Sequence, residues 1–131
     1  MSVRFVYGVF PAFITWTYDL GAEGRAGVAN GLRIRIRPDY AGDRGLLEHE
    51  LRHVRRYVRG IFCFWERPSH LELEVEAYRV QLDFYPEDDT PEKRDARLED
   101  FAERLSRPGP GGYGFGITQV QARDLLLRCN P

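Results

Sequence analysis

The stretch LLEHELRHVRRYVRG, which begins at residue 46, contains the pattern His-Glu-x-x-His. Its histidines are His49 and His53, and residues four positions apart on an α-helix share one face, so both imidazoles can reach one metal ion. Glu50 lies about 60° around such a helix from His53. A carboxylate there can accept a proton from metal-activated water without competing as a ligand. The pattern predicts a catalytic metal site; the alternative for the two histidines is a hydrogen-bonded surface pair.

A third ligand is expected downstream, because catalytic zinc keeps three protein ligands and leaves its fourth position to water. The segment SHLELEVEAYRVQLDFY, residues 69–85, offers Glu72, Glu74 and Glu76. On a helix only Glu74 lies beside Tyr78 at the edge of the apolar stripe. A carboxylate at the border of an apolar face is costly unless it is paired or bound to a metal. We therefore predict Glu74 as the third ligand.

Two side chains near the predicted ligands, His70 and Tyr57, each allow two interpretations. His70 lies one helical turn before Glu74, and it is either a competing ligand or donor in the site, or an exposed residue of the first turn. Tyr57 lies one turn beyond His53 on the same side, where it either supports a ligand or simply packs in the core. Core packing is the favoured interpretation of Tyr57.

The elements that carry these residues are predicted by their periodicity. Residues 3–10, 13–20 and 32–37 are typical of strands, because they are rich in β-branched and aromatic residues or alternate apolar with polar ones. The intervening residues 21–31 indicate a turn or flexible loop. Asp43 is the expected N-cap of a helix that runs to Arg59 and ends at Gly60.

Three further helices follow. Ser69 and Glu72 form a capping box, which predicts a helix from residue 70 to about 85. Thr90 caps a third helix that stops near residue 109, and Thr118 opens a short final one. The apolar linker at 60–68 is expected to be packed. The glycine-rich segment RPGPGGYGFG, residues 107–116, is either a flap over the site or, as favoured, a plain connector.

Composition indicates one soluble domain. The chain has 131 residues, 43% of them hydrophobic, and a net charge of −1, which gives no overall field to attract nucleic acid or membrane. No apolar run approaches the roughly 18 residues of a membrane span, and the N-terminus lacks the features of a secretory signal. Cys63 and Cys129 lack any CxxC spacing and are expected as reduced thiols. We expect a cytoplasmic location, with association with a phage particle as the alternative.

The motif HELRH, preceded by the strand LRIRIRP and followed by a helix with ELEVEAYRVQL, resembles the gluzincin branch of zinc metallopeptidases. It is most similar to small single-domain versions, including those of phages and prophages, over roughly residues 30–85. The resemblance implies a zincin-like α+β fold for residues 1–131, with a small N-terminal sheet packed on an active-site helix and a glutamate helix, and further C-terminal helices. It also implies Zn²⁺ bound by His49, His53 and Glu74, with Glu50 as base.

One position departs from this family. Many gluzincins place an aspartate four residues after the glutamate ligand to orient a histidine, whereas this chain has Tyr78. Tyr78 is therefore predicted as a second catalytic residue, which donates a hydrogen bond to a ligand or to the oxyanion.

The predicted activity is zinc-dependent hydrolysis of peptides or proteins, with the strand at 32–37 as an edge that binds substrate in extended form. The rival is a non-catalytic zinc-binding structural or assembly protein with a phage partner. A third hypothesis is nucleic-acid binding through four arginines of the HELRH helix, although a solvated face is favoured. These residues are Arg52, Arg55, Arg56 and Arg59.

Overall fold

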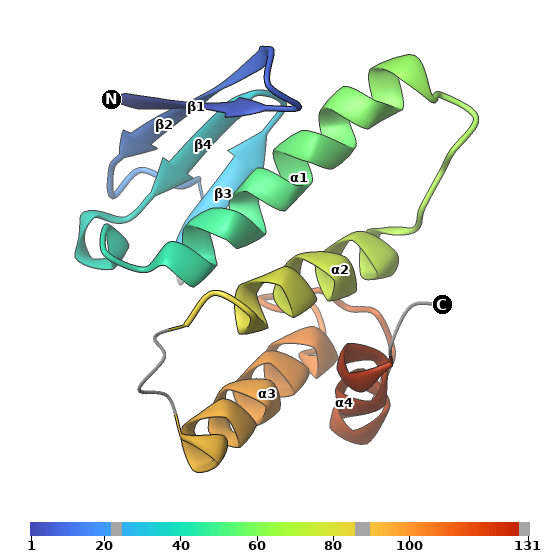
Figure 1. Cartoon of the computed structure of the whole chain (residues 1–131). Coiled ribbons are helices and arrows are strands. Elements are labelled where there is room, and N and C mark those ends of the chain that lie inside the picture. The colour runs from blue at the N-terminus through green and yellow to red at the C-terminus, as the bar shows by residue number, and fades with distance from the viewer. Residues whose placement is uncertain (22–24, 86–89, 129–131) are drawn as a thin grey trace.

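The computed structural model describes residues 1–21, 25–85 and 90–128. Within these ranges the chain is an α+β protein with one four-stranded sheet and four α-helices, which confirms the predicted class. The elements are β1 (Ser2–Val6), β2 (Phe10–Trp16), β3 (Gly27–Asn30), β4 (Arg33–Ile36), the 3₁₀ turn η1 (Pro38–Tyr40), α1 (Arg44–Phe62), α2 (His70–Leu82), α3 (Pro91–Ser106) and α4 (Gln119–Leu127). Figure 1 shows α1 lying along the sheet, α2 crossing the middle of the molecule, and α3 and α4 on the far side of α2.

The sheet has the order β1-β2-β4-β3, with β2 and β4 parallel and the other two pairs antiparallel. The predicted strand at 32–37 is therefore central, and its interpretation as an edge is wrong. The edge strand is β3, which forms from the segment predicted as a loop. Its four residues GVAN carry little strand propensity of their own, so pairing with β4 and contact with α1 decide their conformation.

One face of the sheet packs against α1. Ile34 and Ile36 of β4 are buried beneath the helix, whereas the alternating Arg33 and Arg35 lie on the opposite face, as a period of two requires. The predicted apolar stripe of α1 is also present. Its residues Leu51, Val54 and Val58 are buried, and Leu47 packs partly buried against them.

A second core lies on the other side of α2. Val75 and Tyr78 of α2 pack there with Phe101 and Leu105 of α3 and with Leu126 of α4. The helix α2 thus separates two apolar clusters and has little face left for solvent. This position explains why a short helix carries several buried residues.

The helix starts agree with prediction, and three of the ends differ. Asp43, Ser69, Thr90 and Thr118 all accept a hydrogen bond from a backbone N–H of the first turn, as predicted. The end of α1 was wrongly placed, because Gly60 does not adopt the positive φ of a glycine cap and the helix continues to residue 62. The helices α2 and α3 end three residues earlier than predicted, at 82 and 106, because a proline follows each within four residues.

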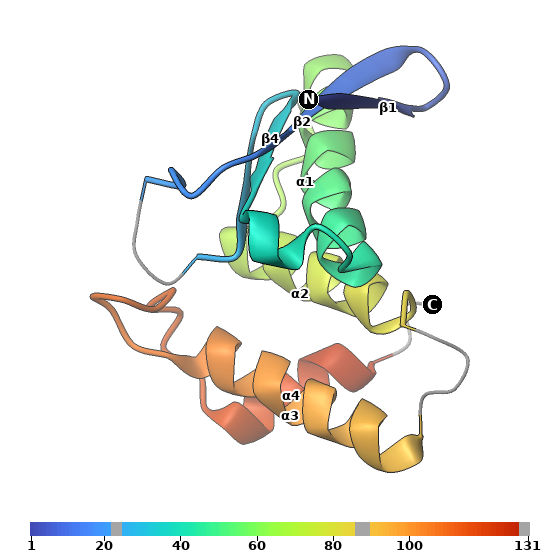
Figure 2. The same cartoon turned by 90° about the vertical axis from the view of Figure 1, so that its left-hand side faces the viewer.

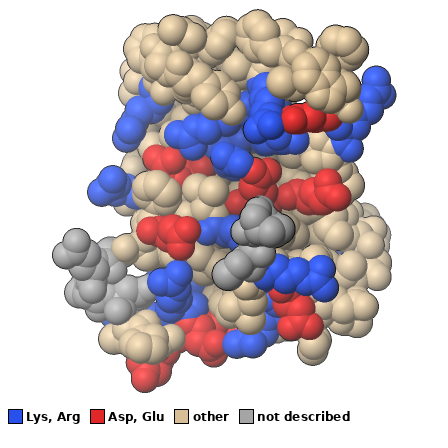
Figure 3. All heavy atoms as spheres, turned by 45° about the vertical axis from the view of Figure 1, so that its right-hand side comes forward, with Lys and Arg blue, Asp and Glu red and all other residues tan. Residues whose placement is uncertain are grey.

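The linker at 60–68 is not packed, contrary to prediction. Ile61, Phe62, Phe64 and Trp65 are 57, 60, 69 and 68% exposed. The longer α1 extends past the sheet (Figure 1), and of these side chains Phe62 keeps a ring contact with Phe10 of β2, at 5.6 Å between centroids. Figure 3 shows a broad surface without charged side chains at the top of this side of the molecule. None of the described helices is both long and apolar enough to cross a bilayer.

Candidate metal centre

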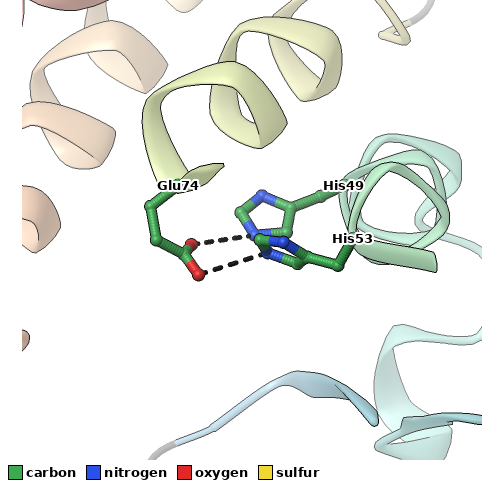
Figure 4. A group of neighbouring side chains, drawn as sticks. All are labelled: His49, His53 and Glu74. Atoms are coloured by element: carbon green, nitrogen blue, oxygen red, sulfur yellow. Dashed lines mark ion pairs between the residues drawn. The ribbon is translucent and has the colours of Figure 1, made fainter. Parts of the chain in front are cut away.

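Side chains from α1 and α2 meet where the two helices lie side by side. His49 and His53 point from α1 towards Glu74 of α2 (Figure 4). The distance from His49 Nε2 to Glu74 Oε2 is 3.4 Å, and that from His53 Nε2 to Glu74 Oε1 is 3.2 Å. One ligand atom of each residue lies within 4.8 Å of the others. This largely buried group, predicted from the sequence, could hold a metal ion.

The protonation of the group suits a cation. Burial alone would raise the pKa of Glu74, but hydrogen bonds and charges from His49 and His53 outweigh it and hold that pKa far below its usual range. Burial alone would lower the pKa of His53, but the hydrogen bond with Glu74 outweighs it, so the pKa is raised. Glu74 is therefore a carboxylate at neutral pH, and it stabilises positive charge at the point where the imidazoles converge.

Glu50 lies beside this group without a partner of its own. Its side chain is buried, and no hydrogen bond to it exists among the described residues. Strand β3 passes so close that a Cβ at Gly27 would lie 3.0 Å from Glu50 Oε1. Burial raises the pKa of Glu50, against the lowering effects of His49 and His53. A carboxylate in this setting has a stronger affinity for protons than an exposed one.

Gln81 of α2 orients the first histidine. Its Oε1 lies 3.0 Å from His49 Nδ1, and its Nε2 donates to the Tyr85 hydroxyl at 2.9 Å. While Nδ1 donates to Gln81, Nε2 is directed at Glu74, and a bound metal would take the place of the Nε2 proton that Glu74 accepts. Gly45 permits this approach, because a Cβ there would lie 3.1 Å from Gln81 Cγ. The sequence predicted this role for Tyr78 and not for Gln81, which lies seven residues after Glu74 and hence near it on the helix face.

We predict that Gln81→Met lowers zinc affinity by about 10- to 100-fold, the usual cost of losing a partner that orients a metal ligand. The thioether keeps the volume of the glutamine side chain but accepts no strong hydrogen bond from His49. Competition with a chromophoric chelator measures the affinity. Gln119→Met, on the exposed start of α4, serves as the matched control. Equal affinities for the two variants would show that His49 needs no partner.

Two tyrosines extend the site on the side of α3. The Tyr113 hydroxyl donates to Glu74 Oε2 at 3.1 Å and lies 3.1 Å from the Tyr78 hydroxyl. Tyr78 itself is buried with its ring edge-on to His49, at 4.5 Å between centroids. The predicted residue Tyr78 thus contacts one ligand by packing and reaches Glu74 through Tyr113. Burial raises the pKa of both hydroxyls, so both stay protonated donors.

Tyr113 was missed because it lies in the glycine-rich segment. The favoured interpretation of residues 107–116 as a plain connector is wrong, since Gly111, Gly112 and Tyr113 all line the cleft over the metal-ligating group. Figure 2 shows this orange loop projecting on the same side of the molecule as the segment that enters β3. The sequence feature that could have identified Tyr113 is a tyrosine within a run of glycines.

His70 and Tyr57 lie at the rim. The side chain of His70 is 64% exposed, with Nε2 3.6 Å from Glu74 Oε1 and its ring edge-on to Tyr113. Both interpretations of His70 therefore hold in part, because it is exposed and yet lies next to a ligand. Tyr57 is 50% exposed and lines the cleft, so its assignment to the core is wrong.

No family model, curated protein or solved structure matches this chain. The metal-ligating group lies in an open cleft. This cleft is lined by the β3 segment from residue 25 to 31, by the ligand face of α1, by the start of α2 and by the Tyr113 loop.

The four arginines of α1 in the nucleic-acid hypothesis lie largely on the other side and are paired. Arg52 contacts Glu76, Arg56 lies 3.5 Å from Glu66, and Arg59 forms two hydrogen bonds with Glu66. Figure 3 shows positive and negative side chains intermixed on this side. Such a face offers no continuous basic surface to a phosphate backbone, which argues against the hypothesis of nucleic-acid binding.

Proposed function

We propose that this chain is a zinc-dependent metallopeptidase of gluzincin type with a zincin-like fold. His49, His53 and Glu74 would hold the zinc ion, and Glu50 would act as general base. The observation that carries the proposal is Glu50, a buried carboxylate without a hydrogen-bond partner among the described residues, next to three side chains that could hold a metal. Burial raises the pKa of this carboxylate, and a purely structural metal site has no use for it.

The donor set suits zinc. Two imidazoles and one carboxylate match the ligands of catalytic zinc sites, although they also accept cobalt or manganese. When bound, zinc would lower the pKa of water towards about 7 and share the charge of the oxyanion. The remaining steps belong to side chains of the chain itself.

Glu50 would move the proton. Its raised pKa favours acceptance of a proton from the attacking water and its later delivery to the leaving amine. The contact of Glu50 with β3 would aim it at a peptide on that strand. The outer edge of β3 has no backbone hydrogen-bond partner among the described residues, so an extended peptide could pair with it as an added strand.

Tyr113 would stabilise the oxyanion. Its single hydroxyl proton points to Glu74 Oε2 at 3.1 Å and would turn to the oxyanion once a bound zinc ion shared the charge of Glu74. Its ring is held by stacking on Phe115. We predict that Tyr113→Phe lowers kcat by about 100-fold, as loss of one oxyanion donor does, with little change in KM. Steady-state kinetics measure the effect, with the more distant Tyr40→Phe as control. An unchanged kcat would assign Tyr113 to structural support alone.

A second candidate function is a non-catalytic zinc-binding structural or assembly protein, with a phage particle as its setting. The exposed apolar side chains of residues 61–65 support it, because exposed apolar patches mark interaction surfaces. Glu50 counts against this function, because a non-catalytic protein needs no general base. The two functions can be told apart because only the peptidase cleaves peptide bonds.

The test is zinc-dependent cleavage of an unfolded protein, followed by mass spectrometry of the products. The proposal predicts new peptide termini with the zinc-loaded chain, none after chelation, and recovery when zinc is restored. Cleavage that persists in chelator would point to a contaminant or another mechanism. Absence of cleavage across several unfolded proteins would favour the assembly protein.

A further inference from the structure

Five arginines line the cleft, and three of them are neutralised by partners. Arg56 lies 3.5 Å from Glu66, Arg104 lies 3.1 Å from Asp100, and Arg107 forms two hydrogen bonds with Glu103. These three pairs contribute little net charge to the cleft.

The other two arginines, Arg25 and Arg67, have no ion-pair partner among the described residues. Arg25 lies two residues before Gly27, the point where β3 passes Glu50. Arg67 lies in the linker three residues before His70, on the side of the cleft formed by the start of α2. Both are exposed. Two unpaired positive charges on different elements therefore face the space over the metal-ligating group.

The remaining carboxylates of the cleft do not cancel this charge. Glu50 and Glu74 belong to the metal centre, and the two charges of a bound zinc ion would offset theirs. Glu66 is occupied by Arg56 and Arg59. The loaded cleft thus keeps an excess of positive charge, although the whole chain has a net charge of −1.

We infer that the cleft selects peptides with acidic side chains close to the scissile bond, with Arg25 and Arg67 as the groups that recognise them. This inference rests on the proposed peptidase function. Charge complementarity across an interface gives selectivity and faster association more than raw affinity. A carboxylate can accept two hydrogen bonds from one guanidinium, so Asp and Glu side chains fit this role well.

Binding to a form that does not turn over tests the selection apart from catalysis. Zinc-loaded Glu50→Gln protein is titrated with a fluorescent ten-residue peptide that has glutamates around its central bond, and with the same peptide in which glutamine replaces them. We expect about tenfold tighter binding of the acidic peptide at low salt and a much smaller difference at 0.5 M salt. Equal affinities would overturn the inference, while failure of wild-type protein to cleave any peptide would instead overturn the proposed function.

Substitution identifies the recognising groups. In the Glu50→Gln background, Arg25→Gln and Arg67→Gln should each reduce the preference for the acidic peptide by about three- to fivefold, the upper part of the range of an exposed ion pair. Arg33→Gln, an exposed arginine outside the cleft, removes the same charge and should leave the preference unchanged. Arg25→Glu should turn the preference towards a peptide with lysines. If Arg33→Gln reduces the preference for the acidic peptide as strongly as the cleft variants do, net charge alone explains the preference. Arg25 and Arg67 would then not be the recognising groups.

Discussion

Replacement of Glu50 by glutamine is expected to lower kcat for peptide hydrolysis by about 10³-fold while zinc stays bound. The amide keeps the size of the carboxylate but cannot accept the proton of the attacking water, and general base catalysis contributes about 10²- to 10⁴-fold. His49, His53 and Glu74 are unchanged, so the zinc content should equal that of the wild type. Single-turnover kinetics and elemental analysis of the same sample measure both effects. Glu92→Gln, on the exposed start of α3, is the matched control.

The same variant should be more stable without metal. Burial raises the pKa of Glu50 in the folded state, so its contribution is present at low pH and is lost as pH rises through that raised value. At pH 7.5 folding must either bury the ionised side chain or protonate it, and both cost free energy that glutamine does not. The thermal midpoint of chelated Glu50→Gln should exceed that of the wild type at pH 7.5, and the two should converge below pH 4. A variant that loses both stability and zinc would show that Glu50 is structural.

Loss of a ligand is expected to reduce zinc affinity by more than the roughly 100-fold upper cost of losing an orienting partner. His53→Ala removes one imidazole, and Glu74→Gln removes the only carboxylate of the group. Zinc at 1,000 times its Kd stabilises a protein by about 4 kcal/mol, so the wild type should show a large rise in thermal midpoint on zinc addition. Both variants should show little or none.

His70→Ala is the matched control for these ligand variants. It removes a histidine 3.6 Å from the same carboxylate, but one with a side chain 64% exposed. The zinc-induced rise should persist in it. A loss as large as that of His53→Ala would make His70 a ligand and would reassign the site.

Local sequence signals predicted the ligand set because each of them acts within a few helical turns. The spacing of His49 and His53 fixes their common face, the apolar stripe fixes which side of α1 meets the sheet, and the capping box fixes where α2 starts. Glu74 followed from the same periodicity. When α1 and α2 pack together with the predicted faces towards each other, His49, His53 and Glu74 come close.

Features that depend on tertiary contacts were missed or wrong. The strand β3 has small residues and takes its conformation from β4, so periodicity could not show it. Gly60 stays helical because a glycine ends a helix only when the chain turns there. Tyr113 meets Glu74 from 39 residues away through a loop with no periodic pattern. The role of Gln81 depends on the contact between α1 and α2, which the periodicity of either helix alone does not predict.

The central claim is that one zinc ion lies between α1 and α2 on two imidazoles and one carboxylate. The most direct measurement is anomalous X-ray diffraction at the zinc edge from crystals of the zinc-loaded chain. The account predicts one strong peak, about 2.0–2.2 Å from His49 Nε2, His53 Nε2 and a Glu74 oxygen. A peak elsewhere, or none in crystals grown with zinc, would contradict the account.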